Sequence, residues 1–359
     1  MYKIMHKSEI IALADEEYIT EILNKALCPH CFVVGMPLYV WLDNRCVDMH
    51  RSHSRKLFKA LRLRNSENTA EIISVGHGVS ITDNWWIQHD NENPDYRSLK
   101  KYNERIADIA LLGGSDSDER NIKGYLELGT VGSYEKAWRF ENDCWYMYKQ
   151  GGTQELVSEY YSYLFLKSMN FDVAEYSIKN IKSAETGLST IFMISKDFTN
   201  NAEVDFEPFC NYFSDNEEPD YIIPKLPEKL INQYVMTIFY DALLFNGDRH
   251  NQNIGIIRDS KTGEILKLAP GFDYNLGLIA SGVPRINKKT GNIFTDVILG
   301  NKTCIAVLEK NIPDKEEILA SVNSATAGVK SALGLEDLNY PLIENYICDT
   351  FDYIYERVK

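Results

Sequence analysis

The chain has 359 residues, 44% of them hydrophobic and 25% charged, and its formal net charge is −14 at neutral pH. This length exceeds that of one typical hydrophobic core and predicts two or three globular units. The acidic balance argues against direct binding to nucleic acid, because contacts with a phosphate backbone need clustered lysine and arginine.

The sequence also lacks membrane and export signals. It has no apolar run of the ~18 residues that a membrane span requires, and residues 1–17 have no apolar signal core. Its seven cysteines are scattered, which is typical of reduced thiols. We therefore expect a cytoplasmic protein without a membrane span.

Residues 1–115 show no catalytic constellation and predict a separate module. The pair Cys28 and Cys31 has the Cys-x-x-Cys spacing of thioredoxin-like oxidoreductases. That motif begins a helix after a buried strand, whereas here a helix over 19–27 is predicted before it and an apolar run over 32–40 follows. No second pair completes a zinc site, so redox or metal chemistry is the weaker interpretation.

A polar, glycine-containing break at 113–118 marks the predicted end of this module. We expect three parts, residues 1–115, 116–205 and 206–359.

The next segment has the pattern of two strands joined by a glycine-bearing turn. Leu126 to Leu128 forms the first predicted strand and 136–140 the second. Glycines let backbone N–H groups approach phosphate oxygens, although an ordinary hairpin turn explains the same pattern. The candidate phosphate-binding residues are Gly129, Thr130, Val131, Gly132 and Ser133.

A short aromatic strand over 145–149 follows a turn at 141–143. Alternation places Lys149 on the same strand face as Trp145 and Met147, and Lys149 is our candidate for binding the α- and β-phosphates. Lys136 competes with it for this role.

Further elements follow in chain order. Thr153 is predicted to cap a helix that contains Glu159, and 191–196 is predicted to be a strand. Residues 200–224 are predicted to be an irregular insertion, and a helix from Pro227 leads to Asp248.

Three polar residues near the end of that helix match the needs of phosphoryl transfer. Asp248 and Asn253 lie five residues apart, as the catalytic aspartate and metal-binding asparagine of protein kinases do, and Asp273 follows as a second acid. Each residue alone fits a cap or a turn. Together, between apolar segments, they favour catalysis, with Asp248 as the base and with Asn253 and Asp273 as Mg²⁺ ligands.

The loop Asp-Arg-His-x-x-Asn at 248–253 resembles the catalytic loops of phosphatidylinositol 3/4-kinases and of HipA-like serine/threonine kinases. Residues 268–273 look more like HipA, because lipid kinases usually carry Asp-Phe-Gly where this chain has Asp273-Tyr274-Asn275. The resemblance implies an α+β, bilobal protein-kinase-like fold. Its N-lobe would be β-rich and its C-lobe helical, and 1–115 would be an extra module.

The resemblance also implies roles outside the catalytic loop. Glu159, with Glu155 as the alternative, would pair with Lys149, and the backbone from Ile194 to Lys196 would meet adenine. In the segment that resembles the HipA phosphate loop, Tyr134 stands where glutamine is typical. The stretch 80–86, which includes Trp85 and Trp86, looks like the N-terminal region of some HipA-like kinases.

The expected activity is transfer of a phosphoryl group from ATP, with Mg²⁺, to a hydroxyl group. The resemblance implies a serine or threonine of a protein as acceptor, and a regulatory, antitoxin-like partner. A phosphoinositide or small-molecule kinase would share every catalytic residue, and a catalytically silent nucleotide-binding regulator is the alternative that is not an enzyme. Thr130 or Ser133 is a candidate for autophosphorylation.

Overall fold

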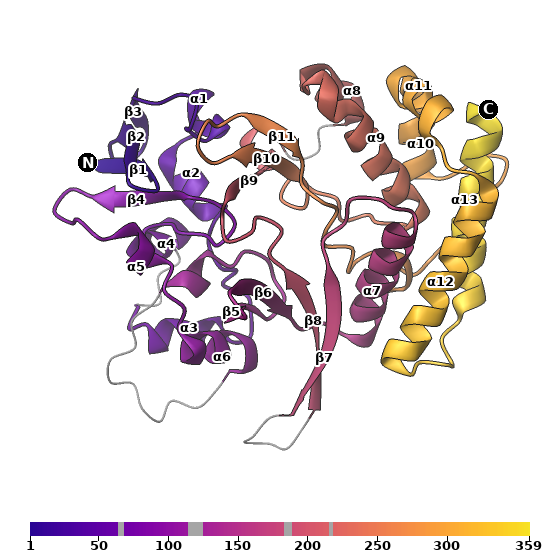
Figure 1. Cartoon of the computed structure of the whole chain (residues 1–359), viewed down its shortest axis with the longest axis horizontal. Helices are drawn as coiled ribbons and strands as arrows, with labels where there is room; N and C mark the ends of the chain where they lie inside the picture. Colours follow the sequence, from indigo (N-terminus) through magenta and orange to yellow (C-terminus); the bar gives the residue numbers. More distant parts are fainter. Residues whose placement is uncertain (64–67, 114–124, 183–188, 215–217) are drawn as a thin grey trace. The chain divides into compact units, whose positions relative to one another are not determined.

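The structure is a computed structural model that describes residues 1–63, 68–113, 125–182, 189–214 and 218–359 (Figure 1). The chain divides into two compact units. Unit 1 comprises Met1–Gln150, Lys179–Tyr212 and Ile256–Leu266, and unit 2 comprises Gly151–Ile178, Phe213–Gly255 and Lys267–Lys359. The predicted boundary at 115 lies within 114–124, outside the described residues, and the three-part division stays a prediction.

The first sheet of unit 1 is antiparallel, and Ile4 at its centre pairs with Ala12 on one side and Ile87 on the other. The predicted helix over 19–27 is wrong, because Ile19–Ile22 is the edge strand and pairs with Leu13 and its neighbours. Two of its four residues are β-branched isoleucines, which favour strands. The strand order is β3(Ile19–Ile22), β2(Glu9–Ala14), β1(Tyr2–His6), β4(Trp85–His89).

The second sheet of unit 1 contains the predicted hairpin. Its turn residues Asn142 and Asp143 have φ values of 51° and 62°, as two-residue hairpin turns require. The predicted strands over 136–140 and 145–149 are confirmed, but Leu126–Gly129 is a 3-10 helix (η1), so the strand predicted there is wrong. The strand order is β5(Lys136–Glu141), β6(Cys144–Lys149), β8(Ser189–Lys196), β7(Tyr176–Lys182).

One hydrophobic core joins the first sheet to one face of the second. Trp85 packs in this core, and Trp86 packs in a smaller cluster with Trp138 and Trp145. The indole N–H groups of Trp85 and Trp86 donate to backbone carbonyls at 2.8 and 2.7 Å, so both residues serve packing. The helices of unit 1 are α1(His30–Val33), α2(Leu38–Asp43), α3(Ser54–Ala60), α4(Thr69–Val75), α5(Tyr96–Leu99) and α6(Glu104–Leu112).

A third sheet takes one of its strands, β9(Val204–Pro208), from the segment 200–224 that was predicted to be an irregular insertion. Its order is β11(Ile265–Leu268), β10(Gly255–Asp259), β9(Val204–Pro208). A buried ion pair of 2.6 Å joins Glu207 of β9 to Arg258 of β10. The acidic composition of 200–224 predicted an exposed, irregular segment, so strand β9 was missed. Glu207 is buried in this strand because it pairs with Arg258.

The Cys-x-x-Cys pair belongs to the core of unit 1. Burial raises the pKa of the Cys28 thiol to about 12, and burial also raises that of Cys31. Thiols that stay protonated are poor nucleophiles and poor metal ligands, which fits the structural role favoured from the sequence.

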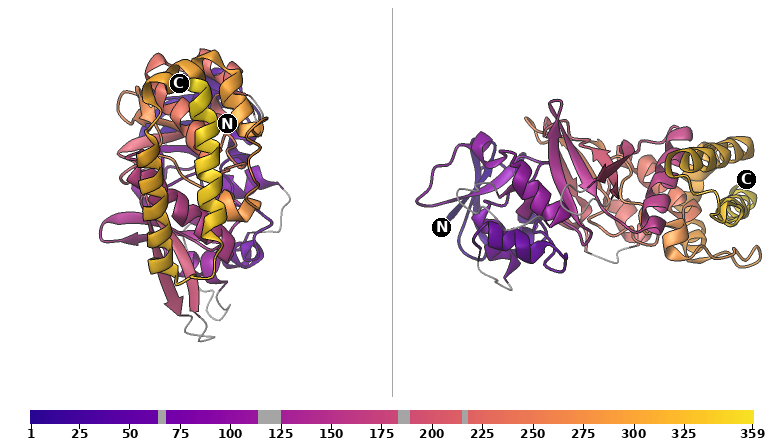
Figure 2. Two further views of the ribbon diagram at one scale, coloured as in Figure 1. Left: turned by 90° about the vertical axis from the view of Figure 1, so that its right-hand side faces the viewer. Right: turned by 90° about the horizontal axis from the view of Figure 1, so that it is seen from below.

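Unit 2 is mainly helical (Figure 1). Helix α12 packs on α7 and on α13, and α13 also packs on α9 (Figure 2). The helices predicted from Thr153 and from Pro227 are confirmed, but Gly152 is the N-cap of α7 and Thr153 makes no cap. The helices are α7(Thr153–Ser168), α8(Pro219–Ile222), α9(Glu228–Leu243), α10(Ile293–Gly300), α11(Lys302–Asn311), α12(Lys315–Leu333) and α13(Tyr340–Val358).

The predicted α+β class, with several antiparallel sheets and a helical C-terminal part, is confirmed. The kinase-like arrangement of two lobes stays a prediction. Across the described ranges, no helix combines the length and the apolar character needed to cross a membrane.

Candidate functional site

Helix α9 leads the chain of unit 2 into the candidate catalytic loop. Its last turn is buried and includes Asp241, and the helix ends at Leu243. Just beyond, Asn246 turns back, since its N–H donates to the carbonyl of Asp241 at 2.9 Å and its side-chain amide donates to the carboxylate of Asp241 at 2.9 Å. This bend places Asp248 at the start of the loop, half-buried.

Arg249 holds the loop together. Its guanidinium makes two bonds with the carboxylate of Asp241, at 2.9 and 3.0 Å. It also donates to the backbone carbonyls of Asn253, at 2.5 Å, and of Phe272, at 2.8 Å. A single side chain therefore joins the segment that carries Asn253 to the segment that carries Asp273.

The environment keeps Arg249 charged. Burial lowers the pKa of the guanidinium, but Asp241, Tyr274 and Asp273 together raise it more, and the net pKa is above the usual value. The guanidinium also lies over the ring of Tyr274, 4.6 Å from its centroid, within the range of a cation–π interaction. A buried charge needs such compensation. The bonds to Asp241, the bonds to two backbone carbonyls and the contact with the ring of Tyr274 all use the planar guanidinium, so this arrangement is specific to arginine.

Asn253 is oriented by its own loop. Its side-chain N–H donates to the backbone carbonyl of Asp248 at 3.1 Å, and its backbone N–H donates to the carbonyl of His250 at 2.9 Å. The first bond turns the amide nitrogen toward the loop and the amide oxygen away from it. That oxygen is a suitable ligand for a hard cation such as Mg²⁺.

Asp273 has an unusual backbone conformation, with φ at 57°, a region that non-glycine residues enter at a cost. Its N–H donates to the hydroxyl of Tyr176 at 3.2 Å. The Tyr176 hydroxyl in turn bonds the carboxylate of Glu159; burial first, and then Glu159, raises the pKa of this phenol. Glu159 is 3% exposed, so unit 2 joins two predicted site residues through one tyrosine.

His250 is exposed, and its Nδ1 accepts from the backbone N–H of Gln252 at 3.2 Å. This bond lies within the loop.

In unit 1, Arg51 braces the candidate phosphate loop. Its guanidinium donates to the carbonyl of Gly132 at 2.6 Å, to that of Lys136 at 3.4 Å and to that of Thr130. Burial lowers the pKa of Arg51 to about 10. The module expected to be separate thus contributes directly to the conformation of this loop.

Backbone and side-chain contacts also fix this loop. The Thr130 hydroxyl is buried and donates to Glu127 at 3.0 Å, and Glu127 also accepts from the N–H of Trp138 at 3.1 Å. A Cβ on Gly129 would collide with the carbonyl of Val79. Ser133 is exposed, so of the two candidate autophosphorylation sites only Ser133 is accessible.

Both candidate lysines lie on one face of the β5–β6 hairpin, because Lys136 and Lys149 are directly opposite each other in the register. Gly132 has φ at 106°, and a Cβ there would collide with Nζ of Lys136. Nζ of Lys149 lies 5.6 Å from the ring centroid of Tyr134. Both lysines and the glycine loop therefore lie at the same end of the hairpin, and the binding of phosphate there stays a prediction.

The remaining predicted residues belong to β8. Ile194 pairs with Tyr148 and is buried in the core, and Lys196 pairs with Tyr146. Strand β8 lies between β6 and β7, and the contact of its backbone with adenine stays a prediction. The pairing of Glu159 with Lys149 also stays a prediction, because these residues belong to different units.

Sequence reasoning missed three residues that position this machinery. None of Arg249, Tyr176 and Arg51 was assigned a role from the sequence. The conspicuous signal was an arginine directly after Asp248 in a loop with few other charges. Arg51 contacts Thr130, which is 79 positions away in the sequence, and Tyr176 contacts Asp273, which is 97 positions away. Local sequence patterns do not show such contacts.

Comparisons with known proteins complete the description. No protein-family model and no curated protein sequence matches this chain. Among solved structures, the fold is similar to the proinflammatory kinase CtkA of Helicobacter pylori, with a TM-score of 0.48 and 20% identity over 62% of this chain and 94% of that one. It is also similar to a chain of the Shewanella oneidensis MR-1 toxin–antitoxin complex of HipA, HipB and operator DNA. There the TM-score is 0.49 and the identity 9%, over 99% of this chain and 97% of that one.

Proposed function

We propose that this chain is an ATP- and Mg²⁺-dependent phosphotransferase that acts on a hydroxyl group. The observation that carries the proposal is the pair of bonds from Arg249 to the carbonyls of Asn253 and Phe272. They hold an amide and a carboxylate of the kind that bind Mg²⁺ close to the half-buried acid Asp248.

The three polar residues take different roles in the proposal. Asp248 orients the acceptor hydroxyl and receives its proton. Asn253 and Asp273 offer one amide oxygen and one carboxylate to Mg²⁺, whose charge would neutralise the phosphate oxygens. Tyr176 positions Asp273, because its hydroxyl accepts the backbone N–H of that residue.

Unit 1 supplies groups for the nucleotide phosphates. Lys149 and Lys136 lie on one strand face, and the loop from Gly129 to Ser133 provides backbone N–H groups. Lys149 stays the first candidate for the α- and β-phosphates. Tyr134 stands where glutamine is typical of the HipA pattern. Its ring contacts Lys149. Lys149 nevertheless lies on the same strand face as Lys136.

The sequence resemblance to HipA-like kinases supports a protein serine or threonine as acceptor and an antitoxin-like regulatory partner. The site chemistry alone specifies only a hydroxyl. Phosphoinositides and small alcohols would need the same three residues, so the acceptor has to be determined by experiment.

The test uses γ-labelled ATP and Mg²⁺ with four acceptors offered separately: the chain itself, a mixed protein substrate, phosphoinositide vesicles and a cell lysate. Label on protein supports the protein kinase, and label on lipid alone identifies a phosphoinositide kinase. If no acceptor is labelled and ATP is not hydrolysed although it binds, the chain is a silent nucleotide-binding regulator and the proposal is wrong.

A further inference from the structure

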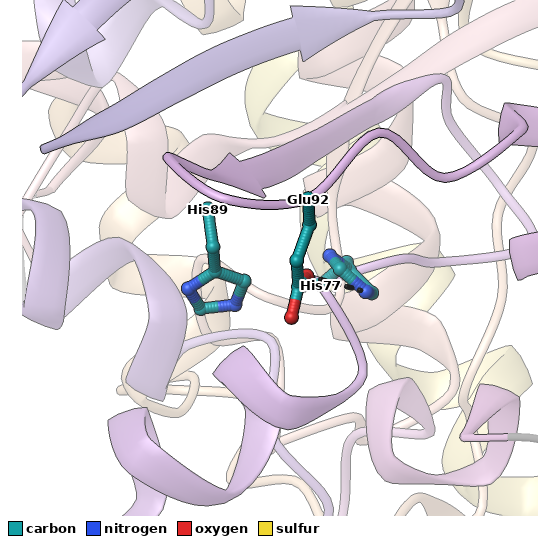
Figure 3. Close-up of side chains that lie close together, drawn as sticks. All are labelled: His77, His89 and Glu92. Carbon is teal, nitrogen blue, oxygen red and sulfur yellow. Dashed lines mark ion pairs between the residues drawn. The ribbon is translucent and has the colours of Figure 1, made fainter.

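A second group of polar side chains lies in unit 1 and includes none of the residues proposed to bind the nucleotide or to react. His77 follows helix α4, His89 ends strand β4, and Glu92 lies in the turn after that strand. One ligand-type atom from each lies within 4.8 Å of the other two. Figure 3 shows the two imidazole rings and the carboxylate gathered below this turn.

The tautomer of His77 is fixed by the backbone. Its Nδ1 lies 3.0 Å from the carbonyl oxygen of Ile87, and since a carbonyl only accepts, Nδ1 carries the hydrogen. The lone pair of the neutral ring is then on Nε2, which lies 3.6 Å from a carboxylate oxygen of Glu92. The backbone is equally constrained, because His77 has φ at 59° and its carbonyl accepts the N–H of Ile87 at 2.8 Å.

His89 repeats this arrangement with its nitrogens exchanged. Its Nε2 lies 3.0 Å from the carbonyl oxygen of Ser74, so Nε2 carries the hydrogen and the lone pair is on Nδ1. Metal-binding histidines commonly donate their second ring N–H to a backbone carbonyl in this way, which fixes the orientation of the ring. The carbonyl contacts therefore fix the orientation of both rings, and the lone pair on Nε2 of His77 is directed toward Glu92.

Glu92 is the residue of the three whose side chain can move. Its backbone is held, because its N–H donates to the carbonyl of His89 at 3.1 Å and its carbonyl accepts from the side chain of Gln88 at 2.6 Å. Its side chain is 52% exposed, against 13% for His77. Rotation of the Glu92 side chain can therefore bring its carboxylate closer to two fixed rings.

We propose that His77, His89 and Glu92 form a binding site for a divalent transition metal, with zinc as the preferred ion. Two imidazoles and one carboxylate are a known zinc ligand set, with metal–ligand distances of about 2.0–2.2 Å and one position left for water. Mg²⁺ and Ca²⁺ prefer oxygen ligands only, so these ions should bind poorly.

Binding would join three segments of unit 1: the end of α4, the end of β4 and the turn that follows it. A ligand that binds only the folded state stabilises it by RT ln(1 + [L]/Kd), so the stabilisation grows with the logarithm of the free ligand concentration. Zinc should therefore raise the melting temperature of the protein in addition to binding it.

The experiment is a calorimetric titration of the full chain with zinc chloride, in excess Mg²⁺ to occupy other oxygen sites. The variants are Glu92→Gln and His89→Gln. The matched control is Asp90→Asn, which removes an exposed acid of the same turn that pairs with the terminal amino group at 3.0 Å. Asp273→Asn separates this site from the proposed kinase chemistry.

We expect one zinc ion per chain in the wild type, in Asp90→Asn and in Asp273→Asn. Both ligand variants should bind zinc at least ~10-fold more weakly, and zinc should no longer raise their melting temperature. No zinc binding by the wild type, or equal affinity in Glu92→Gln and Asp90→Asn, would overturn the proposal. If His89→Gln does not fold, Glu92→Gln decides, because its side chain is exposed.

Discussion

Two arginines hold the two candidate loops, and they do so in different ways. In unit 2, Arg249 joins the catalytic loop through two backbone carbonyls while Asp241 neutralises its charge. In unit 1, Arg51 holds the phosphate loop through backbone carbonyls, including that of Gly132. Burial lowers the pKa of both guanidinium groups, but Asp241 and its neighbours together raise that of Arg249 above the usual value, whereas the pKa of Arg51 falls to about 10.

This difference shows how each loop depends on its arginine. The bonds of Arg249 include a buried ion pair, and loss of one partner of such a pair leaves an uncompensated charge. Arg51 donates hydrogen bonds to neutral carbonyls of its loop and interacts with Glu127 and Glu135 only through its charge, so its loss leaves carbonyls without a donor but breaks no hydrogen-bonded ion pair. We therefore expect the catalytic loop to be the more sensitive of the two.

The largest effect should come from Asp273→Asn. Removal of the carboxylate should weaken Mg²⁺ binding and lower the rate of phosphoryl transfer on the order of a thousandfold, since a metal contributes several kcal/mol to such a transition state. Turnover measured across a Mg²⁺ titration checks this. Asp172→Asn, an exposed acid of the same unit that pairs with Lys267, should leave the rate unchanged, and an equal loss in both variants would contradict the assignment.

Arg249→Ala should destabilise unit 2 by about 3–5 kcal/mol, because Asp241 would then be buried without its partner. Urea unfolding followed by circular dichroism measures the loss. Lys267→Ala removes an exposed ion pair of the same unit and should cost about 0–1 kcal/mol. Equal losses in the free energy of unfolding of the two variants would show that Arg249 does not hold this loop together.

Arg51→Ala should cost less, about 1–3 kcal/mol, because neutral carbonyls lose their donor. It should also weaken ATP binding by releasing the loop from Gly129 to Ser133. Equilibrium nucleotide binding and urea unfolding together measure both effects. Arg55→Ala, at an exposed position of helix α3, is the control, and a loss as large as that of Arg249→Ala would remove the distinction between the loops.

Glu127 gives the smallest effect and a pH dependence. Burial raises its pKa from 4.5 to about 7, so the folded state holds a proton that the unfolded state releases. Its contribution to stability is complete below about 4.5 and is lost as the pH rises through about 7. The wild type should therefore lose more stability than Glu127→Gln between pH 5 and pH 8, in denaturant titrations at each pH. Parallel losses would mean that Glu127 does not titrate there.

Local signals predicted the elements that depend on local patterns. Alternation and the turn at Asn142 gave the β5–β6 hairpin, and helical spacing gave α7 and α9. The failures have different physical causes. Strand β9 is stabilised by Glu207 pairing with Arg258, 51 positions away. The edge strand at Ile19 instead pairs with its chain neighbour β2, and Leu126–Gly129 forms a 3-10 helix rather than a strand.

In the candidate site, too, local sequence patterns predicted some residues and missed others. Asp248, Asn253 and Asp273 were predicted from their spacing along the chain. Their supporting residues were not, since Tyr176 reaches Asp273 across 97 positions and Arg51 reaches Thr130 across 79. A motif therefore indicates the groups that react, whereas the structure is needed to find what holds them.

The most direct measurement compares the wild type with Asp248→Asn for transfer from γ-labelled ATP, at nucleotide and Mg²⁺ concentrations that saturate both proteins. The account predicts a rate lower by roughly a hundred- to ten-thousandfold in the variant, because the positioned base is lost, with unchanged affinity for ATP. Asp259→Asn, an acid outside the candidate catalytic loop, should retain the wild-type rate. Full activity in Asp248→Asn, or no transfer by the wild type to any acceptor, would contradict the account.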